Sequence, residues 1–165
     1  MTVVSNTSPI INLAAIEQLT LLHQLYGRLM IPPAVYQEIA VMGPYAAGAQ
    51  EVRQQAWISC ATVTDRALVS ALSIELDPGE AEAIAAAVEL RAELLLIDEQ
   101  RGRMIAQRLG LRVVGLLGIL IEAKHRGLIE TVKPLLDALI TRAGFWVKKD
   151  LYTRVLQAAG EKSNG

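Results

Sequence analysis

Four side chains with oxygen donors stand where they could hold a metal ion: Asn6, Glu38, Glu80 and Asp98. Where carboxylates gather, two of them 4 Å apart repel each other by roughly 4 kcal/mol at an effective dielectric constant near 20. A divalent cation relieves this repulsion, and Mg²⁺ characteristically takes one or two carboxylates together with waters and substrate phosphates. A metal bound in this way lowers the pKa of a water and stabilises the leaving oxygen of a phosphodiester. The residue types therefore predict metal-assisted phosphodiester hydrolysis.

These residues can act together only if the chain brings them to one edge of a sheet. Short apolar runs of the strand type occur at residues 2–5, 29–31, 57–63, 94–97 and 112–114. Helical patterns separate the runs, which is typical of parallel strand–helix–strand units. Asn6 follows the first run and Asp98 ends the fourth, so both are predicted at the carboxyl edge of the sheet, where ligands bind in such folds. Glu38 and Glu80 lie near the beginnings of two predicted helices and can reach the same edge.

The helix signals complete the fold prediction. The first helix is predicted to begin with Ser8 as N-cap and Pro9 in the first turn. Further helices are predicted to begin at Pro32-Pro33, at Asp77-Pro78 and after Asp98, and residues 115–159 are mainly helical in pattern, with breaks near Gly127, Lys133-Pro134 and Gly144. We therefore predict a three-layer α/β/α sandwich with a central parallel sheet and a helical C-terminal third. One domain over residues 1–159, a loop at 43–48 and a disordered tail at 160–165 complete the prediction.

Composition adds modest limits on class and compartment. The chain has 165 residues, 52% of them hydrophobic, which suits one domain with both sheet faces covered. Its single cysteine, Cys60, allows no internal disulfide and favours a reducing compartment. No secretory signal is recognised, and the most apolar later segment, 113–121, is too short to span a bilayer. We expect a cytoplasmic protein that does not associate with membranes.

The formal net charge of −1 conceals an asymmetry along the chain. Residues 1–100 carry four basic and twelve acidic side chains, whereas residues 101–165 carry twelve basic and five acidic ones. This pattern is compatible with a metal-binding acid cluster flanked by a phosphate-binding surface. It is equally compatible with solvated helix faces that happen to be unevenly charged.

Each of the four residues also has an interpretation without a functional role. Glu80 matches a capping box with Asp77, in which its carboxylate returns to the Asp77 amide, and this interpretation has even weight. Asp98 could be only the N-cap of the following helix. Asn6 could be a turn residue, and Glu38 an ordinary exposed acid. Only the joint arrangement favours a site.

Other residues that could do chemistry carry weaker signals. His23 and His125 are far apart and lack metal-ligand spacing, and Cys60, within an apolar run, is predicted to be a core residue. Three further acids are predicted on a solvated helix face and the turn after it: Glu82, Glu89 and Glu93. No glycine-rich loop follows the first strand, which disfavours a nucleotide-binding Rossmann-like protein.

The order and spacing of several motifs resemble the PIN-domain family. The motifs are Val-Val-Ser-Asn-Thr-Ser-Pro-Ile, Ile-Pro-Pro-Ala-Val-Tyr-Gln-Glu, Asp-Pro-Gly-Glu-Ala-Glu-Ala-Ile and Leu-Leu-Ile-Asp-Glu, and the resemblance extends from Val3 to about Gly144. The most similar subgroup comprises small prokaryotic PIN-like proteins that begin with Ser-Asn-Thr-Ser-Pro, and many relatives are VapC-type toxins. The resemblance implies a ribonuclease that depends on Mg²⁺ or Mn²⁺ and acts as the toxin of a toxin–antitoxin pair. It also implies an RNA substrate, a cognate antitoxin and a homodimer.

Carried over by motif, the resemblance assigns the site residue by residue. Asn6 stands at the position of the first aspartate, and Glu38, Glu80 and Asp98 complete the catalytic and metal-binding quartet. Side chains placed beside these ligands are Thr7, Ser8 and Glu99. Basic residues that could hold the phosphate backbone are Arg101, Arg103 and Lys124. Arg101 also stands where many PIN domains have another acid.

Asn6 is the departure that matters for function. An amide oxygen can ligate a cation, but it brings no negative charge and cannot act as a base. Metal affinity should therefore fall, and two functions stay open. The first is a metal-dependent ribonuclease, and the second is a catalytically weakened PIN scaffold that binds RNA or protein without cutting.

Overall fold

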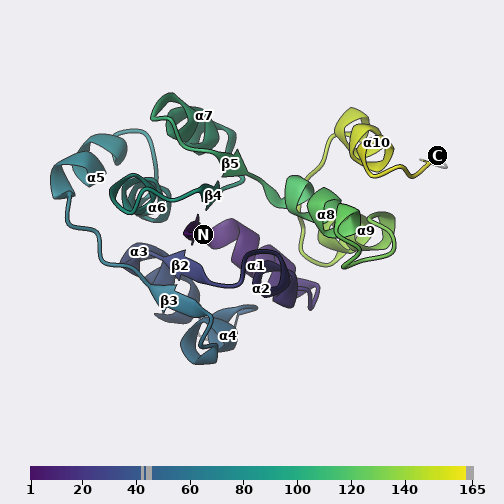
Figure 1. Ribbon diagram of the computed structural model, residues 1–165, viewed down its shortest axis with the longest axis horizontal. Coiled ribbons are helices and arrows are strands. Elements are labelled where there is room, and N and C mark those ends of the chain that lie inside the picture. Colours follow the sequence, from purple (N-terminus) through teal and green to yellow (C-terminus); the bar gives the residue numbers. More distant parts are fainter. Residues whose placement is uncertain (42, 44–45, 163–165) are drawn as a thin grey trace.

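A computed structural model of the protein describes residues 1–41, 43 and 46–162, and its centre is a five-stranded sheet. The order across the sheet is β3 (Ile58–Cys60), β2 (Leu29–Ile31), β1 (Val3–Ser5), β4 (Leu94–Leu96) and β5 (Val113–Val114). Each neighbouring pair is parallel. Every strand lies within one of the predicted apolar runs, so the predicted α/β/α sandwich with a parallel sheet is confirmed (Figure 1).

Helices cover both faces of the sheet because successive strand residues point to opposite sides. Val3 and Leu96 belong to one buried core, and Val4 and Leu95 belong to the other. The first core packs against α1 (Thr7–Ala15), α2 (Thr20–Tyr26), α3 (Pro33–Tyr36), α4 (Ala49–Gln54), α8 (Leu116–His125), α9 (Lys133–Thr141) and α10 (Lys149–Ala158). The second core packs against α5 (Arg66–Leu72), α6 (Pro78–Glu89) and α7 (Gln100–Arg108). The strands are therefore buried on both faces, which is why they are continuous apolar runs in the sequence.

The chain changes direction across the sheet between β1 and β4. From β1 it moves outward to β2 and β3, and it then returns to the opposite side of β1 to form β4 and β5. Ser5 pairs with Leu96, and the amide of Asn6 donates a hydrogen bond to the Leu96 carbonyl at 2.9 Å. In open α/β sheets such a reversal leaves a crevice at the carboxyl ends of the two strands. Asn6 and Asp98 follow these two strands.

Local structure differs from the prediction where helices begin. Helix α1 begins at Thr7 with Asn6 as its N-cap, so the prediction of Ser8 as N-cap was wrong. Helix α3 continues directly into a π turn, η1 (Gln37–Val41), which no pattern in the sequence indicated. Helices α6 and α7 match their predicted positions.

Ordered structure continues into the segment predicted as a disordered tail. Glu161 accepts hydrogen bonds from the backbone N–H groups of Val132 and Lys133, at 2.6 and 3.1 Å. Its carboxylate also pairs with Lys124 at 2.9 Å. Residues 163–165 of that segment, and residues 42, 44 and 45 in and beside the predicted 43–48 loop, lie outside the described residues.

None of the helices in the described residues has both the length and the apolar character that crossing a membrane requires.

Candidate active site

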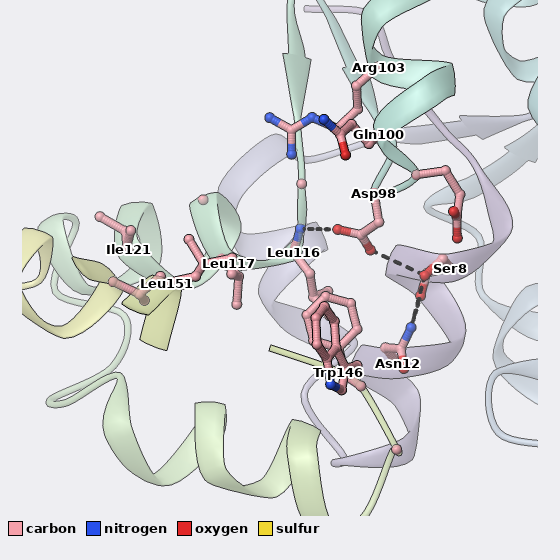
Figure 2. Close-up of a pocket in the computed structure, with 16 residues that line it drawn as sticks. Ser8, Asn12, Asp98, Gln100, Arg103, Leu116, Leu117, Ile121, Trp146 and Leu151 are labelled. Atoms are coloured by element: carbon pink, nitrogen blue, oxygen red, sulfur yellow. Dashed lines mark hydrogen bonds between the residues drawn. The ribbon is translucent and has the colours of Figure 1, made fainter. Parts of the chain in front are cut away.

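Asp98 lies at the carboxyl end of β4, and two donors from different elements hold its side chain. The Leu116 N–H donates a hydrogen bond to Asp98 Oδ1 at 2.7 Å, and the Ser8 hydroxyl donates one to Oδ2 at 3.2 Å (Figure 2). The interpretation of Asp98 as the N-cap of α7 was wrong, because Glu99 occupies that cap position. Burial raises the pKa of Asp98 above its ordinary value, although Leu116, Ser8 and Arg103 act in the opposite direction. Asp98 is therefore a half-buried acid fixed at the N-terminus of α8.

Glu38 comes to the same edge of the sheet from the π turn η1. Single π turns in proteins are frequently found at functional sites. The hydroxyl of Thr7 donates a hydrogen bond to the Glu38 carboxylate, as expected for a residue beside the ligands. The other constraint on Glu38 is Gly79 at the start of α6, since a Cβ atom there would lie 2.6 Å from Glu38 Oε1. Glu38 therefore approaches α6 as closely as a glycine allows.

Glu80 is buried in the first turn of α6, with 7% of its surface exposed. Its backbone N–H donates to Asp77 Oδ1 at 2.8 Å, and a hydrogen bond from the Asp77 backbone to its carboxylate acts to lower the pKa of Glu80, so both halves of the predicted capping box are present. The Glu80 carboxylate itself reaches helix α7, where a Cβ atom on Gly102 would lie 2.9 Å from Oε2. Burial, then the hydrogen bond and charge of Asp77, and then the charge of Glu99 raise the pKa of Glu80 to about 8. Glu80 is thus a buried acid that retains its proton at neutral pH unless another charge compensates it.

Asn6 contributes a buried oxygen that accepts no hydrogen bond. The residue is 4% exposed, and its Oδ1 atom has no hydrogen-bond partner among the residues that the structure describes. Its side chain does not cap helix α1, although Asn6 occupies the N-cap position. A buried polar atom without a partner costs about 1–3 kcal/mol. The burial of Oδ1 therefore costs stability, and a role as a simple turn residue does not explain this cost.

Three glycines that the sequence analysis did not single out make room for the acids. They are Gly79, Gly102 and Gly115, and each lies at the beginning of a helix. A Cβ atom on Gly115 would lie 3.0 Å from Asp98 Oδ1 and 2.5 Å from a guanidinium nitrogen of Arg103. One acid thus lies against each glycine. The sequence shows only that these glycines fall at the beginnings of helices. It gives no reason to connect each glycine with a particular acid.

The structure brings the predicted acids to one edge without gathering them into a single cluster. Among the residues that it describes, no three His, Cys, Asp or Glu side chains form a group that could hold a metal ion. Asp98 and Glu38 line separate hollows, and Asn12 lines both. Glu99 connects the acids electrostatically, because its charge raises the pKa of both Glu80 and Asp98.

Asp98 opens into a cleft with a volume of about 810 Å³. Gln100 and Arg103 lie at its polar end, and Ser8 and Asn12 lie along one side (Figure 2). Glu99 also lines this cleft. Side chains from α8, α10 and the loop before α10 form an apolar wall. The cleft therefore combines a fixed acid, a cation and an apolar surface.

The three predicted RNA-binding cations have different surroundings. Arg103 lines the cleft, but Arg101 lines a neighbouring hollow together with Glu75 and Met104, and Glu99 and Gln100 border both. Lys124 lies eight residues beyond Leu116 on α8, about 12 Å along the helix, and pairs with Glu161. Lys124 is not among the residues that line this cleft, and its contact with RNA stays a prediction.

Several residues predicted to be peripheral have structural roles. Glu82 is buried, accepts a hydrogen bond from the Ala34 N–H at 2.9 Å and pairs with Arg66 at 3.0 Å, so its placement on a solvated face was wrong. Glu89 accepts hydrogen bonds from the N–H groups before helix α5. Cys60 is exposed at the end of the edge strand β3, which contradicts its prediction as a core residue.

The donor chemistry fits a hard divalent cation that keeps much of its water. Mg²⁺ binds oxygen ligands and commonly uses only one or two carboxylates, so a compact three-acid cluster is not required. The orphaned Oδ1 of Asn6 offers a neutral oxygen donor between β1 and β4. Carboxylates of Glu38, Glu80 and Asp98 lie on the surrounding helix starts and strand end.

The structure is an α/β/α domain with a parallel sheet, and acidic side chains lie around the central part of the carboxyl edge of this sheet. The motifs in the sequence predicted such a domain. The family model described as the PIN domain matches residues 2–161 of the chain. The protein therefore belongs to the PIN-domain family, whose members are generally nucleases. No curated protein matches its sequence significantly.

Proposed function

We propose that the protein is a metal-dependent endoribonuclease that uses Mg²⁺ or Mn²⁺. The observation that supports this most directly is the buried Asn6 Oδ1 atom, which has no hydrogen-bond partner at the carboxyl edge between β1 and β4. A cation would satisfy this oxygen and would offset the repulsion among the acids nearby. When bound, the cation would activate a water and stabilise charge on the phosphodiester.

The residues of the chain have distinct roles in this proposal. Asp98, Glu38 and Glu80 supply negative charge, and Asn6 supplies a neutral oxygen. The Ser8 hydroxyl and the Leu116 N–H orient the Asp98 carboxylate, and the Thr7 hydroxyl orients Glu38. These bonds keep the acids in place before substrate binds, which reduces the reorganisation needed during the reaction.

Two further side chains have roles in the proposed ribonuclease. Arg103 faces the cleft beside Asp98 and is placed to contact a phosphate of the RNA backbone. Glu99 lies beside Glu80 and Asp98, and its charge would favour cation binding at this edge.

Cleavage of a structured RNA in Mg²⁺, Mn²⁺ and EDTA tests this proposal. Wild type should cut in metal and lose activity in EDTA, and Asp98→Asn should be inactive while remaining folded. Glu130→Gln serves as the matched control, since it neutralises an exposed acid outside the cleft. Unchanged cleavage by Asp98→Asn would remove Asp98 from the mechanism. No cleavage by folded wild type in either metal would contradict the ribonuclease proposal.

We also propose that the ribonuclease is the toxin of a toxin–antitoxin pair and forms a homodimer. The resemblance of its opening motif to small prokaryotic PIN-like proteins supports this role. Expression should arrest growth of a bacterial host, and co-expression of a cognate antitoxin should restore growth. Light scattering of the purified protein should give twice the mass of the 17.9 kDa chain. Growth without arrest would contradict the toxin role, and a monomeric mass would contradict the homodimer.

The absence of a three-acid group among the described residues favours a second candidate, a PIN scaffold with weakened catalysis that binds RNA or protein. Calorimetric titration with Mg²⁺ and Mn²⁺ separates the two candidates. Metal binding at millimolar concentration or below supports the ribonuclease. Lack of binding by the folded protein supports the scaffold.

A further inference from the structure

Trp146 is a large apolar side chain that the fold leaves in solvent. It lies in the loop of residues 142–148 between α9 and α10, and 76% of its surface is exposed. Its neighbours Phe145 and Val147 are half-buried and pack against the first core. Trp146 therefore faces solvent, whereas the side chains on either side of it pack against the first core. An exposed indole on an otherwise packed segment is a candidate binding group.

Hydrogen bonds to two helices anchor the loop that carries Trp146. The Phe145 N–H donates a hydrogen bond to the Leu139 carbonyl at 2.9 Å. A guanidinium nitrogen of Arg142 donates one to the carbonyl of Ala15, at the end of α1, at 3.3 Å. These contacts join the loop to α9 and to the helix that carries Ser8. Trp146 is thus presented from a fixed backbone, which reduces the entropy lost on binding a ligand.

Trp146 lines the same cleft as Asp98. Figure 2 shows Asp98 and Ser8 in the middle of the cleft, Gln100 and Arg103 at one end and Trp146 at the other. An RNA whose scissile phosphate approaches Asp98 can place an adjoining nucleotide along this cleft. The aromatic surface therefore lies on the path of the substrate.

We propose that Trp146 is a stacking platform for an unpaired base next to the scissile phosphate. This inference rests on the proposed function, because it takes RNA as the substrate. Bases stack on aromatic side chains without regard to sequence, since every base presents a π face. Arg103, at the opposite end, contacts the backbone while Trp146 holds the base.

The charges in the cleft agree with a nucleic-acid strand as the occupant. Arg103 forms no ion pair at 4 Å or less within the described part of the chain, and it lies near Asp98 in the cleft, where its guanidinium can also meet a phosphate. The backbone N–H groups at the beginning of α8 lie beside it, where the helix dipole favours negative charge. A wholly apolar partner would remove the guanidinium of Arg103 from water without offering it a hydrogen-bond acceptor. An RNA strand carries phosphates that can meet Arg103 at one end of the cleft and bases that can meet Trp146 at the other.

The emission of Trp146 can be measured alone because the chain has only two tryptophans. The other, Trp57, stacks on His23 at a centroid distance of 5.0 Å, beside the first residue of β3. Trp57→Phe keeps an aromatic ring there and leaves Trp146 as the only tryptophan. In an Asp98→Asn background, a short single-stranded oligoribonucleotide should quench this emission. Polyphosphate, which has charge but no bases, should not.

Binding and kinetics give the second measurement. Trp146→Ala should weaken binding of the labelled oligoribonucleotide, measured by fluorescence anisotropy, by roughly 5- to 100-fold, and Trp146→Phe should retain most of the affinity. Leu151→Ala is the matched control, since it removes an apolar side chain from the same cleft without removing a ring. In the active protein, Trp146→Ala should raise KM with little change in kcat.

The outcomes separate this inference from the proposed function. Binding of RNA without quenching of Trp146 emission overturns the stacking platform and leaves the ribonuclease intact. Equal losses in Trp146→Ala and Leu151→Ala also overturn it, and indicate a general apolar surface suited to a protein segment. Quenching by RNA in a protein that never cleaves supports the platform and contradicts the ribonuclease. Absence of RNA binding overturns both. If Trp57→Phe does not fold, the difference in quenching between wild type and Trp146→Phe gives the same test.

Discussion

The carboxylate of Asp98 accepts a hydrogen bond from the backbone N–H of Leu116 at 2.7 Å. This bond joins the acid that follows β4 to the first residue of α8, eighteen positions later in the chain. It satisfies one of the N–H groups that have no partner within the helix, and the helix dipole stabilises the negative charge. The candidate catalytic residue therefore also holds the first turn of α8.

This relationship predicts that Asp98→Asn and Asp98→Ala differ in stability although neither cleaves RNA. Asparagine keeps an oxygen that can accept the Leu116 N–H, whereas alanine leaves this donor without a partner. We expect Asp98→Ala to lower the free energy of unfolding by about 1 kcal/mol more than Asp98→Asn does. Urea denaturation of the two variants beside wild type measures the difference. Equal stability of the two variants would contradict the capping role of Asp98.

Gly79→Ala should disturb the site through the position of Glu38. A Cβ atom on Gly79 would lie 2.6 Å from Glu38 Oε1, so the carboxylate must move or the helix must shift. We expect cleavage activity to fall. We also expect the free energy of unfolding to fall by about 1–3 kcal/mol, the usual cost of overpacking. Glu38→Asp shortens the side chain and should relieve the clash. Activity and urea stability of the two single variants and the double variant form a double-mutant cycle, and purely additive effects would contradict the contact.

The sheet and its edge could be predicted because they depend on local patterns. Strands buried on both faces are apolar runs, and Asn6 and Asp98 follow two such runs directly. Parallel topology then places both at one edge without any knowledge of side-chain contacts. The contacts of Gly79 and Gly102 with acids could not be predicted in this way, because each joins positions that are far apart in the sequence.

Helix α6 shows why the prediction for Glu82 was wrong. An alternation of acids and alanines suggests a helix with one solvated face, but every residue of α6 from Gly79 to Ala87 is buried. Small alanine side chains let neighbouring elements approach from all sides, so the acid needed partners, and Ala34 and Arg66 provide them. Burial of this kind depends on neighbouring elements and leaves no periodic signal.

Asn6→Asp should strengthen metal binding. The substitution places a carboxylate where Asn6 Oδ1 now has no partner, so an added cation gains a charged ligand. Even a third of the roughly 4 kcal/mol available at 4 Å corresponds to about tenfold in affinity. Without metal the buried charge should lower stability, because nothing compensates it. Calorimetric titration with Mn²⁺ measures the affinity, and thermal unfolding with and without Mn²⁺ measures the stability. Unchanged affinity would place Asn6 outside the metal site.

Glu161→Gln should destabilise the C-terminal helices in a way that depends on pH. Burial alone would raise the pKa of Glu161, but the N–H of Val132, the ammonium group of Lys124 and the N–H of Lys133 outweigh it and hold the pKa below its ordinary value of 4.5. A carboxyl whose pKa is lowered on folding contributes stability above its unfolded pKa, and this contribution is lost as the pH falls through the folded pKa.

At neutral pH we therefore expect the Glu161→Gln variant to be less stable than wild type by about 1 kcal/mol. The difference should shrink as the pH falls below the ordinary glutamate value, because wild type then loses the same charge. Urea denaturation at neutral pH and at several acidic values measures this difference, with Glu130→Gln as the control for an exposed acid. A difference that stays constant over this range would show that the charge of Glu161 does not stabilise the fold. The contacts at Val132 and Lys133 would then depend only on its shape.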